Sequence, residues 1–584
     1  MKRLRVLLAL LLFWSILPAL PGFAIPVVQD LIAKGPEADP RAYMSTTTYL
    51  AWLVAPSLVD AAPAFRAAAA AIQTTGGNLI VPSGVFGSGD YWFNSGGIAL
   101  GDNVNLVGKG GRIHRNFKYD NTALSTTNCV FSLTGNNIVT GITYNGHGES
   151  SDVYPGAQSQ IYTYYCDFAI SSAYKNVKIL GNTFKNSPGS FFTSTAESVT
   201  MSGNIFLDWL DHCFYVGNST ATTSGNISIT GNVFKGELAT TTRDPLKFDG
   251  NISNIAISGN VFNQVYTSPD MPAIHLGARY NDNGSIGSVS ITGNSANMYS
   301  GTFVGIYKTT TTDNSYVGNV VVSGNIVNST YGMSIGTRPT DNTTQNGASV
   351  LSMLINGNKF SGTNAWIANG VDLPGIYGIE QLVVSNNVIE VGSTIYFMGN
   401  IRDLVFDGNT LVGAGQNNGI SFGLPANDGY HWHPGTNDNT FAGHASITNN
   451  KYIGVYAGVI ESGADATHPS AIGLSIYLAG NQQLGGTHAS RRILLTDAAY
   501  PPTTTLTVGP GNYATTASTL NPIVWGGPRA DMGDASPYGY RTHTDNVNGN
   551  LTSFFVGEVA LDNTNKIWYK AVVSGVDNEW KALN

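Results

Sequence analysis

Asn-Ile-Ser-Ile-Thr-Gly-Asn-Val-Phe, residues Asn226–Phe234, is a phrase that this chain repeats in close copies. The copies span Asn176–Phe184, Ser198–Phe206, Asn254–Phe262, Ser288–Asn294, Asn319–Val327, Ser352–Phe360, Gln381–Ile389 and Asp403–Leu411. Their closing asparagines are separated by as few as 22 residues (Asn182 to Asn204) and by as many as 34 (Asn260 to Asn294). This spacing is typical of one turn of a solenoid.

Within each copy, apolar residues alternate with small polar ones, which is the pattern of a strand with one buried face. Ile227 and Ile229 are expected to point into the core and Ser228 outward. Gly231 and Asn232 end the strand, because both residue types tolerate the left-handed backbone of a sharp corner. Asparagines at the same corner of every coil can form a hydrogen-bonded ladder. We therefore predict an all-β fold, a right-handed parallel β-helix, because the leucines and 3.6-residue period of leucine-rich or helical repeats are missing.

The composition suits this fold and argues against one class of partner. The chain has 584 residues, 69 of which are glycines. Only 11% of all residues are charged, and the net charge is −8. Abundant glycine with few charges is typical of a chain that is filled by strands and tight turns. The sequence has no basic patch, so we do not expect nucleic acid as a partner.

Residues 1–24 have the form of a secretory signal peptide. Lys2 and Arg3 give it a positive start, Val6–Leu20 is its apolar stretch, and Gly22-Phe23-Ala24 offers a small-residue cleavage site. An uncleaved membrane anchor is the alternative, but the apolar run is short and Pro18 interrupts it. We expect the protein to be exported, cleaved at this site and secreted, with no membrane contact afterwards.

The rest of the chain divides into three segments. Residues 25–97 contain Ala64–Ile72, an Ala-rich amphipathic helix with Asp60 near its start. We expect this helix to plug the open apolar end of the solenoid. Residues 98–490 form the parallel β-helix, and a polar insertion over Ala426–His444 lengthens one turn. In residues 491–584, Pro501–Thr505 is interpreted as a linker to a small C-terminal β-module, which suits trimerisation, carbohydrate contact or plain capping.

The cysteines and histidines give no sign of a cofactor. Three cysteines in so long a chain are not a disulfide framework, and we interpret Cys129, Cys166 and Cys213 as buried or half-buried thiols. No Cys/His spacing of the zinc type appears. His431 and His433 resemble a metal pair but have no third partner in their polar insertion, so no metal is predicted there.

Residues with acid–base chemistry concentrate in three successive coils, over residues 208–216, 243–249 and 273–279. Since apolar residues on either side of them face the core, their side chains are expected to point outward, and coils stack at about 4.8 Å. We predict one outward column of Tyr215, Lys247, His275 and Tyr307, with carboxylates beside it. The candidate catalytic residues are Asp208, Asp211, Asp244 and Asp249, and the candidate substrate-binding residues are Trp209, His212, Tyr215, Arg243, Lys247, His275, Arg279 and Tyr307.

Paired carboxyl groups predict hydrolysis of a glycosidic bond, because one can act as the acid and the other as base or nucleophile. Asp211 with Asp244 or Asp249, on adjacent coils, fits this requirement. The alternative without chemistry is structural: Asp208 and Asp211 cap a turn, and Lys247 forms an ion pair with Asp249 or Asp244.

The same column also fits a polysaccharide lyase. Lys247, His275 or Tyr215 would abstract the C5 proton of a uronate, and Arg243 or Arg279 would neutralise its carboxylate. In that case Asp208, Asp211 and Asp249 would hold a calcium ion; a hydrolase would need no cofactor.

The stretch Asp60–Phe86, the repeated Ile-x-Ile-x-Gly-Asn phrase and the N-terminal cap resemble the pectate-lyase-like β-helix superfamily over about Asp60–Leu484. This group includes polygalacturonase-type hydrolases, polysaccharide lyases and bacteriophage tailspike depolymerases. The resemblance implies a polysaccharide groove lined by Asp or Glu pairs and, by analogy with tailspikes, a homotrimer. The polygalacturonase signatures are not intact, since Gly146-His147-Gly148 lies several coils too early. We expect a secreted depolymerase that hydrolyses an extracellular or capsular polysaccharide; a lyase and a glycan-binding adhesin remain the alternatives.

Overall fold

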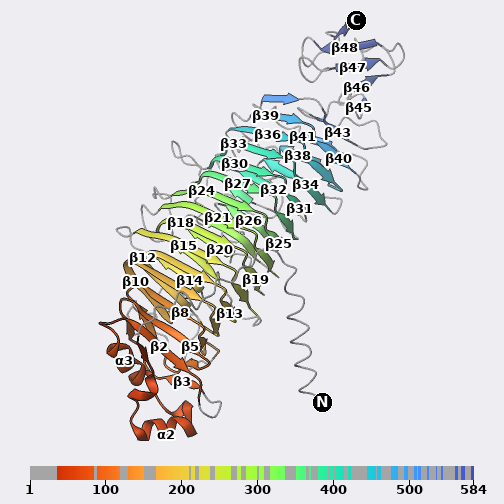
Figure 1. The fold of residues 1–584 in the computed structure, drawn as a ribbon. Helices are drawn as coiled ribbons and strands as arrows, with labels where there is room; N and C mark the ends of the chain where they lie inside the picture. The colour runs from red at the N-terminus through yellow and green to blue at the C-terminus, as the bar shows by residue number, and fades with distance from the viewer. Residues whose placement is uncertain are drawn as a thin grey trace, which may run out of the picture.

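The computed structural model describes residues 36–84, 89–118, 129–149, 166–187, 189–209, 212–217, 223–236, 244–264, 272–277, 285–298, 301–307, 316–329, 331–335, 350–362, 367–369, 379–391, 395–398, 401–413, 419–422, 443–455, 457–461, 475–484, 492–496, 505–508, 511–514, 523–524, 534–535, 541–543, 559–562, 567–571 and 580–583. Over these residues the chain winds into a right-handed parallel β-helix with helices at one end and a small separate sheet after the other (Figure 1). The predicted fold class is confirmed.

Each full coil contributes one strand to each of three faces. The site face contains β4 (Ile98–Leu100), β7 (Phe131–Leu133), β14 (His212–Gly217), β17 (Leu246–Asp249), β20 (Pro272–Gly277), β23 (Thr302–Tyr307), β26 (Tyr331–Ile335), β29 (Ile367–Asn369), β32 (Ile395–Met398), β35 (Ile420–Phe422), β38 (Ala457–Glu461), β41 (Arg492–Thr496) and β44 (Ile523–Val524).

The phrase face holds the repeated Ile-x-Ile segments. It contains β1 (Glu37–Ala38), β2 (Gly77–Pro82), β5 (Val104–Lys109), β8 (Asn137–Thr140), β15 (Thr223–Thr230), β18 (Asn251–Ser258), β21 (Ser285–Thr292), β24 (Tyr316–Ser323), β27 (Val350–Asn356), β30 (Ile379–Ser385), β33 (Ile401–Asp407), β36 (His444–Thr448), β39 (Ser475–Ala479) and β42 (Thr505–Val508). Two longer strands, β10 (Phe168–Leu180) and β12 (Gly189–Ser202), run through both the site face and the phrase face, so these two faces form one continuous sheet.

The short-strand face follows the Gly-Asn corner. It contains β3 (Asp90–Phe93), β6 (Arg112–Arg115), β9 (Thr143–Asn145), β11 (Thr183–Lys185), β13 (Ile205–Leu207), β16 (Val233–Lys235), β19 (Val261–Gln264), β22 (Ser295–Met298), β25 (Ile326–Asn328), β28 (Lys359–Ser361), β31 (Val388–Val391), β34 (Thr410–Gly413), β37 (Lys451–Ile453), β40 (Gln482–Leu484) and β43 (Tyr513–Ala514).

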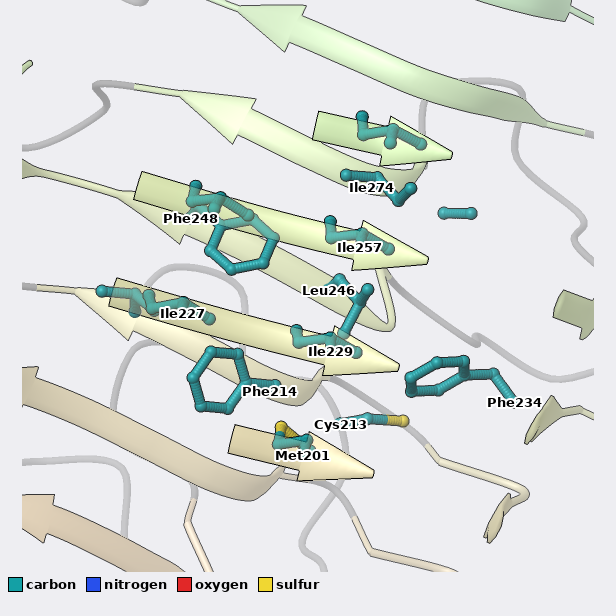
Figure 2. Packing of buried hydrophobic residues seen from close by; sticks show 14 of the residues in the cluster. Met201, Cys213, Phe214, Ile227, Ile229, Phe234, Leu246, Phe248, Ile257 and Ile274 are labelled. Atoms are coloured by element: carbon teal, nitrogen blue, oxygen red, sulfur yellow. The ribbon is translucent and has the colours of Figure 1, made fainter. Parts of the chain in front are cut away.

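The coils stack in register, so equivalent residues meet in the core. Ile227 pairs with Ile255, and Phe234 pairs with Phe262, whose rings stack at a centroid distance of 4.9 Å. Figure 2 shows Phe214 and Leu246 of the site face packed toward Ile229 of the phrase face. Because strand side chains alternate, the neighbours of these core residues point away from the core.

The Gly-Asn corner has the predicted geometry. Gly231 has φ +62°, the left-handed conformation that favours glycine. The buried Asn232 donates its Nδ2 hydrogen to Oδ1 of Asn260 (3.0 Å), and its own Oδ1 accepts from the backbone N–H (2.9 Å) and Nδ2 (2.8 Å) of Asn204. The same hydrogen bonds run through Asn182, Asn204, Asn232, Asn260, Asn294, Asn325, Asn358, Asn387, Asn409, Asn450, Asn481 and Asn512.

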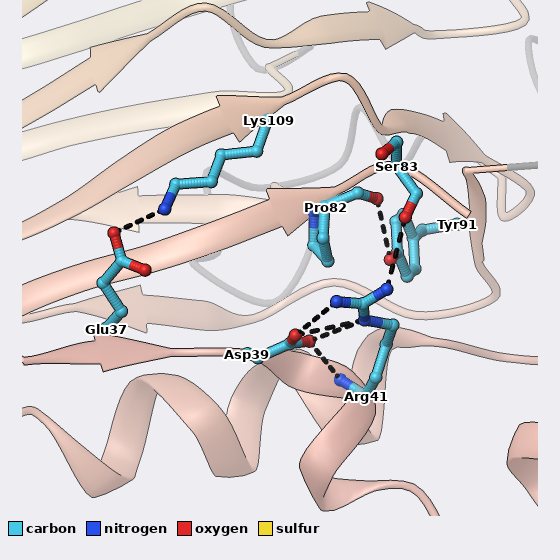
Figure 3. Close-up of polar contacts among 7 residues, drawn as sticks. All are labelled: Glu37, Asp39, Arg41, Pro82, Ser83, Tyr91 and Lys109. Atoms are coloured by element: carbon cyan, nitrogen blue, oxygen red, sulfur yellow. Dashed lines mark hydrogen bonds and ion pairs between the residues drawn. The ribbon is translucent and has the colours of Figure 1, made fainter. Parts of the chain in front are cut away.

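The predicted capping helix is confirmed as α3 (Ala62–Ala71), and its buried Phe65 packs edge-on against Tyr91 and Phe93. A second helix, α2 (Thr46–Val54), and the short 3-10 turns η3 (Pro40–Tyr43) and η4 (Pro56–Leu58) extend the cap. Figure 3 shows how polar contacts attach this segment to the first coils: Arg41 binds Asp39 and the carbonyl of Ser83, and Lys109 binds Glu37. No helix among the described residues is long and apolar enough to cross a membrane.

At the other end, parallel pairing continues past the boundary predicted at residue 490. β41 pairs with β38, β42 with β39, and β44 with β41, so Thr505 begins a strand of the β-helix rather than ending a linker. The predicted C-terminal β-module is a five-stranded sheet of β45 (Asp534–Ala535), β46 (Arg541–His543), β47 (Val559–Asp562), β48 (Ile567–Ala571) and β49 (Trp580–Leu583).

The interpretation of all three cysteines as thiols is wrong for two of them. Cys129 and Cys166 form a disulfide, with a Cα–Cα distance of 5.3 Å across 37 residues of sequence. The return of the chain after one coil brings the two residues together, which their sequence spacing alone does not reveal. Cys213 is a free thiol buried in the main core, and its burial raises its pKa.

Candidate active site on the site face

The predicted column of outward residues exists over three coils. Tyr215 of β14 pairs with Lys247 of β17, which pairs with His275 of β20. The next member is Gly305 of β23, not Tyr307 as predicted. Tyr307 pairs with Gly277, two residues further along the strand, so it belongs to the neighbouring column with Asp249.

These side chains do not form the exposed wall that the sequence suggested. Their strand neighbours Leu246, Phe248 and Ile274 lie in the core, so the column points away from it, yet Tyr215 is only 4% exposed, Lys247 5% and His275 2%. Tyr215 packs with Ala169 and the Cys129–Cys166 disulfide in a small apolar cluster apart from the main core. The column is therefore a buried layer on the outer side of the sheet.

Asp244 and His275 form the best-defined pair of the site. His275 Nδ1 lies 2.7 Å from Asp244 Oδ2, and both side chains are buried. Burial acts to raise the pKa of Asp244, but the hydrogen bond and charge interaction with His275 outweigh it, so the pKa lies below its ordinary value. Burial lowers the pKa of His275 against the opposing effect of Asp244. The arrangement is a neutral imidazole that donates from Nδ1 to an ionised carboxylate.

Asp249 is a buried carboxylate without a hydrogen-bond donor. It is 2% exposed, and neither Oδ1 nor Oδ2 has a hydrogen-bond partner; the Oδ1 of Asp244 lacks one as well. The Nζ of Lys247 lies 3.6 Å from Asp249 Oδ2 and 5.0 Å from the ring centroid of Tyr215. A buried carboxylate whose cation lies beyond hydrogen-bond distance is costly to keep, which is unusual for a purely structural pair.

A glycine makes room for these side chains. A Cβ on Gly277 would lie 2.9 Å from His275 Nε2 and 3.0 Å from Asp249 Oδ1. His275 and Asp249 therefore lean over the same backbone position from adjacent columns. The sequence analysis did not identify Gly277 as part of the site. Its position two residues after His275 in β20, which puts it on the same side of the sheet, is the signal that could have identified it.

Two further candidates surround this centre. His212 Nδ1 lies 2.9 Å from the backbone carbonyl of Asp244, and its ring lies beside Tyr215 with centroids 5.2 Å apart. Asp208 lies in the turn after β13 with φ +54°, and its backbone N–H donates to the carbonyl of Lys235. This place in a turn agrees with the capping alternative for Asp208.

The place of Trp209 does not support its predicted role in substrate binding. Trp209 is 1% exposed and belongs to the main core, where its ring meets Phe234 edge-on at 6.5 Å. The turn after β13 directs the ring inward. Asp211, Arg243, Arg279 and the side chain of Tyr307 lie outside the described residues.

The described part of the site offers an ammonium group, an imidazole and the carboxylate of Asp249 in two neighbouring columns, and the carboxylate of Asp244 just before β17. This set can hold a ligand that donates hydrogen bonds and can move protons to or from it. No group of three or more His, Cys, Asp or Glu side chains among the described residues is arranged to hold a metal ion.

Comparison with solved structures finds the tailspike protein of E. coli bacteriophage HK620 in complex with a pentasaccharide, at a TM-score of 0.46 and 15% sequence identity. The likeness covers 75% of this chain and 77% of that chain. A variant of the same tailspike, also in complex with the pentasaccharide, has a TM-score of 0.42 and 14% identity, with the same coverage of both chains. No family model and no curated protein matches the chain. We assign no site residue from this likeness.

Proposed function

We propose that this protein is a secreted depolymerase that hydrolyses glycosidic bonds of an extracellular polysaccharide at the site of Asp244, Lys247, Asp249 and His275. The observation that carries the proposal is Asp249, a buried carboxylate that lacks a hydrogen-bond donor and follows the core residue Phe248 in strand β17. Its neighbour Asp244 supplies the second carboxyl group that glycoside hydrolysis needs.

The two carboxyl groups can take different roles because their surroundings differ. Asp244 is kept ionised by its hydrogen bond to His275, which suits a base or nucleophile. Asp249 makes no such hydrogen bond and is the partner that exchanges a proton with the substrate. Lys247 and Tyr215 form the side of the site from which the sugar is held.

A lyase is the second candidate, and the Asp244–His275 pair favours it. A neutral imidazole held by a carboxylate is the form that abstracts a proton, and Lys247 lies beside it to stabilise developing negative charge. This reaction requires a uronate in the substrate.

Product analysis separates the candidates. The secreted protein is incubated with neutral and acidic exopolysaccharides, and new reducing ends and ultraviolet absorbance are followed together. We expect new reducing ends without the absorbance of an unsaturated uronate. Reducing ends with that absorbance would establish a lyase instead. Binding without either signal would leave a glycan-binding adhesin.

A further inference from the structure

Two histidines meet on the outer side of the short-strand face, near the N-terminal end of the β-helix. His114 lies in β6, and His147 lies 33 residues later in the turn after β9. The Nδ1 of His114 is 2.9 Å from the Nε2 of His147. Their side chains are 14% and 19% exposed, so this pair has access to solvent. It lies on a different face from the candidate active site.

Each imidazole is oriented by a carboxylate at its other nitrogen. His114 Nε2 lies 3.1 Å from Asp90 Oδ1, and His147 Nδ1 lies 3.0 Å from Glu149 Oε1. Because an ionised carboxylate only accepts hydrogen bonds, these outer nitrogens carry the protons of the neutral imidazoles. The two inner nitrogens then face each other with their lone pairs, and a cation between them relieves the repulsion. A carboxylate at the outer nitrogen is also how proteins orient metal-binding histidines.

The two inner nitrogens are held in place by their surroundings. Trp92 of β3 pairs with His114 in register, and its ring stacks on those of His114 and His147 at centroid distances of 4.5 and 5.0 Å. His147 has φ +50°, which is uncommon for a residue other than glycine, and its backbone N–H donates to Asn145 Oδ1 at 3.0 Å. Both imidazoles are therefore oriented before any ligand binds.

The separation of the inner nitrogens indicates a coordination geometry. Two nitrogens at right angles around a metal ion, each about 2.1 Å from it, lie about 3.0 Å apart, whereas tetrahedral zinc would need about 3.4 Å. Right-angled nitrogen sites are typical of Cu²⁺ and Ni²⁺, and Cu²⁺ is the most tightly bound of the divalent series. The guanidinium of Arg112, 2.7 Å from Asp90 Oδ1, acts against a cation and should weaken the site.

We propose that His114 Nδ1 and His147 Nε2 bind one divalent transition-metal ion of the Cu²⁺ or Ni²⁺ type, with water completing its coordination. With two protein ligands, this site is smaller than the groups of three or more that are absent from the described residues. The ion would join β6 to the turn after β9 and stabilise the first coils. Two histidines 33 residues apart form no recognisable metal motif, so the sequence did not indicate the site.

Titration of the full-length protein with CuCl₂ and NiCl₂ tests the proposal. The protein is first dialysed against a chelator and then against buffer without it, and binding is followed by calorimetry and tryptophan fluorescence. We expect one bound ion per chain, and His114→Gln and His147→Gln should each weaken its binding at least about tenfold. NiCl₂ should raise the melting temperature of the unaltered protein and not that of either variant.

Trp92 supplies a local signal, because its ring stacks on both imidazoles. Bound Cu²⁺ should quench the fluorescence of this residue. Trp92→Phe should lose this part of the quenching while it still binds the ion.

Two controls separate this site from other histidines. His444→Gln, at an exposed histidine of β36, should bind the ion as the unaltered protein does. So should the double variant with His431→Gln and His433→Gln, which lie outside the described residues. Loss of the ion in the double variant overturns the proposal, as does unchanged binding in His114→Gln and His147→Gln, or no binding by the unaltered protein. If the two histidine variants do not fold, equal quenching in Trp92→Phe and the unaltered protein overturns it.

Discussion

At the scale of single residues, the site depends on which of its buried side chains carry a charge. The hydrogen bond to His275 keeps the carboxylate of Asp244 ionised, and burial keeps the imidazole of His275 neutral against the opposing effect of Asp244. The same shielding leaves Asp249 with Lys247 as its counter-ion and without a donor. Stability and chemistry are therefore coupled at these positions.

This coupling predicts a loss of stability on acidification. Both groups have a folded-state pKa below the ordinary value, so the folded state binds fewer protons and is favoured at higher pH. The contribution of His275 is present above its ordinary pKa of 6.5 and is lost as the pH falls through its lowered folded-state pKa. The contribution of Asp244 has the same sign: it is present above the ordinary pKa of 3.8 and is lost as the pH falls through the lowered folded-state pKa. Melting temperatures between about pH 7.5 and 5.5 should decline more steeply for the unaltered protein than for His275→Gln.

The control for this experiment is His444→Gln, at an exposed histidine of β36. It should leave the slope of melting temperature against pH unchanged. Equal slopes for the unaltered protein and His275→Gln would show that burial does not hold the imidazole neutral.

At the scale of the element, each coil is fixed by its corner as much as by its strands. The corner places Gly in the left-handed conformation and Asn in the ladder, and this pair sets where the short-strand face begins. Asn386 and Asn449 take the left-handed position in two coils with φ +55° and +57°, as expected of the residue type that tolerates this conformation best after glycine.

The ladder should be costly to interrupt. Asn232→Ala removes the oxygen that accepts from the backbone N–H and Nδ2 of Asn204, both of them buried. We expect a loss of stability on the order of 2–5 kcal/mol, measured as a shift of the denaturant midpoint. Asn226→Ala, at an exposed asparagine of the same coil, should change stability by less than about 0.5 kcal/mol. Similar effects of the two substitutions would mean that the ladder is not a main source of stability.

The strands and corners were predictable where one coil repeats another. They were less predictable where the structure depends on the neighbouring segments. The phrase at Asn226–Phe234 predicts strand, corner and inward residues, because period-2 alternation and Gly-Asn are local signals. The coil register of Tyr307 and the inward turn of Trp209 depend on strand lengths and loop paths, which vary from coil to coil. The last coils keep only the corner, at Gly480-Asn481 and Gly511-Asn512, while the phrase itself fades.

For the site, the sequence predicts which residues lie together but not how they interact. The column of Tyr215, Lys247 and His275 follows from alternation within strands. The burial of this column and the pairing of Asp244 with His275 depend on how the flanking segments pack, which one sequence does not specify. The catalytic and sugar-binding roles of these residues stay predictions.

At the scale of the whole molecule, a solenoid must protect its ends, because an open end exposes both apolar core and unpaired strand edge. The N-terminal end is closed by α3, whose buried face covers the first coils (Figure 1). The C-terminal module follows the last coils, and its role in trimerisation or sugar contact stays a prediction, as does the homotrimer itself.

The cap should be essential to the folded solenoid. Phe65 is fully buried against Tyr91 and Phe93, so Phe65→Ala should cost about 3–5 kcal/mol. Light scattering during a thermal scan should also show earlier association, since the exposed edge can pair with other chains. Leu58→Ala, at a side chain that is 83% exposed in the same segment, is the control. It should neither lower stability nor cause earlier association. Unchanged melting of Phe65→Ala would contradict the capping role.

The turnover of a polysaccharide substrate by Asp249→Asn, measured beside Asp403→Asn and the unaltered protein, tests the central assignment most directly. If Asp249 exchanges a proton with the sugar, its amide variant should lose at least about a hundredfold in rate while its melting temperature and circular dichroism stay close to those of the unaltered protein. Asp403→Asn, at an exposed carboxylate on the phrase face, is the matched control and should retain full activity. Full activity of a folded Asp249→Asn variant would contradict the assignment of this site.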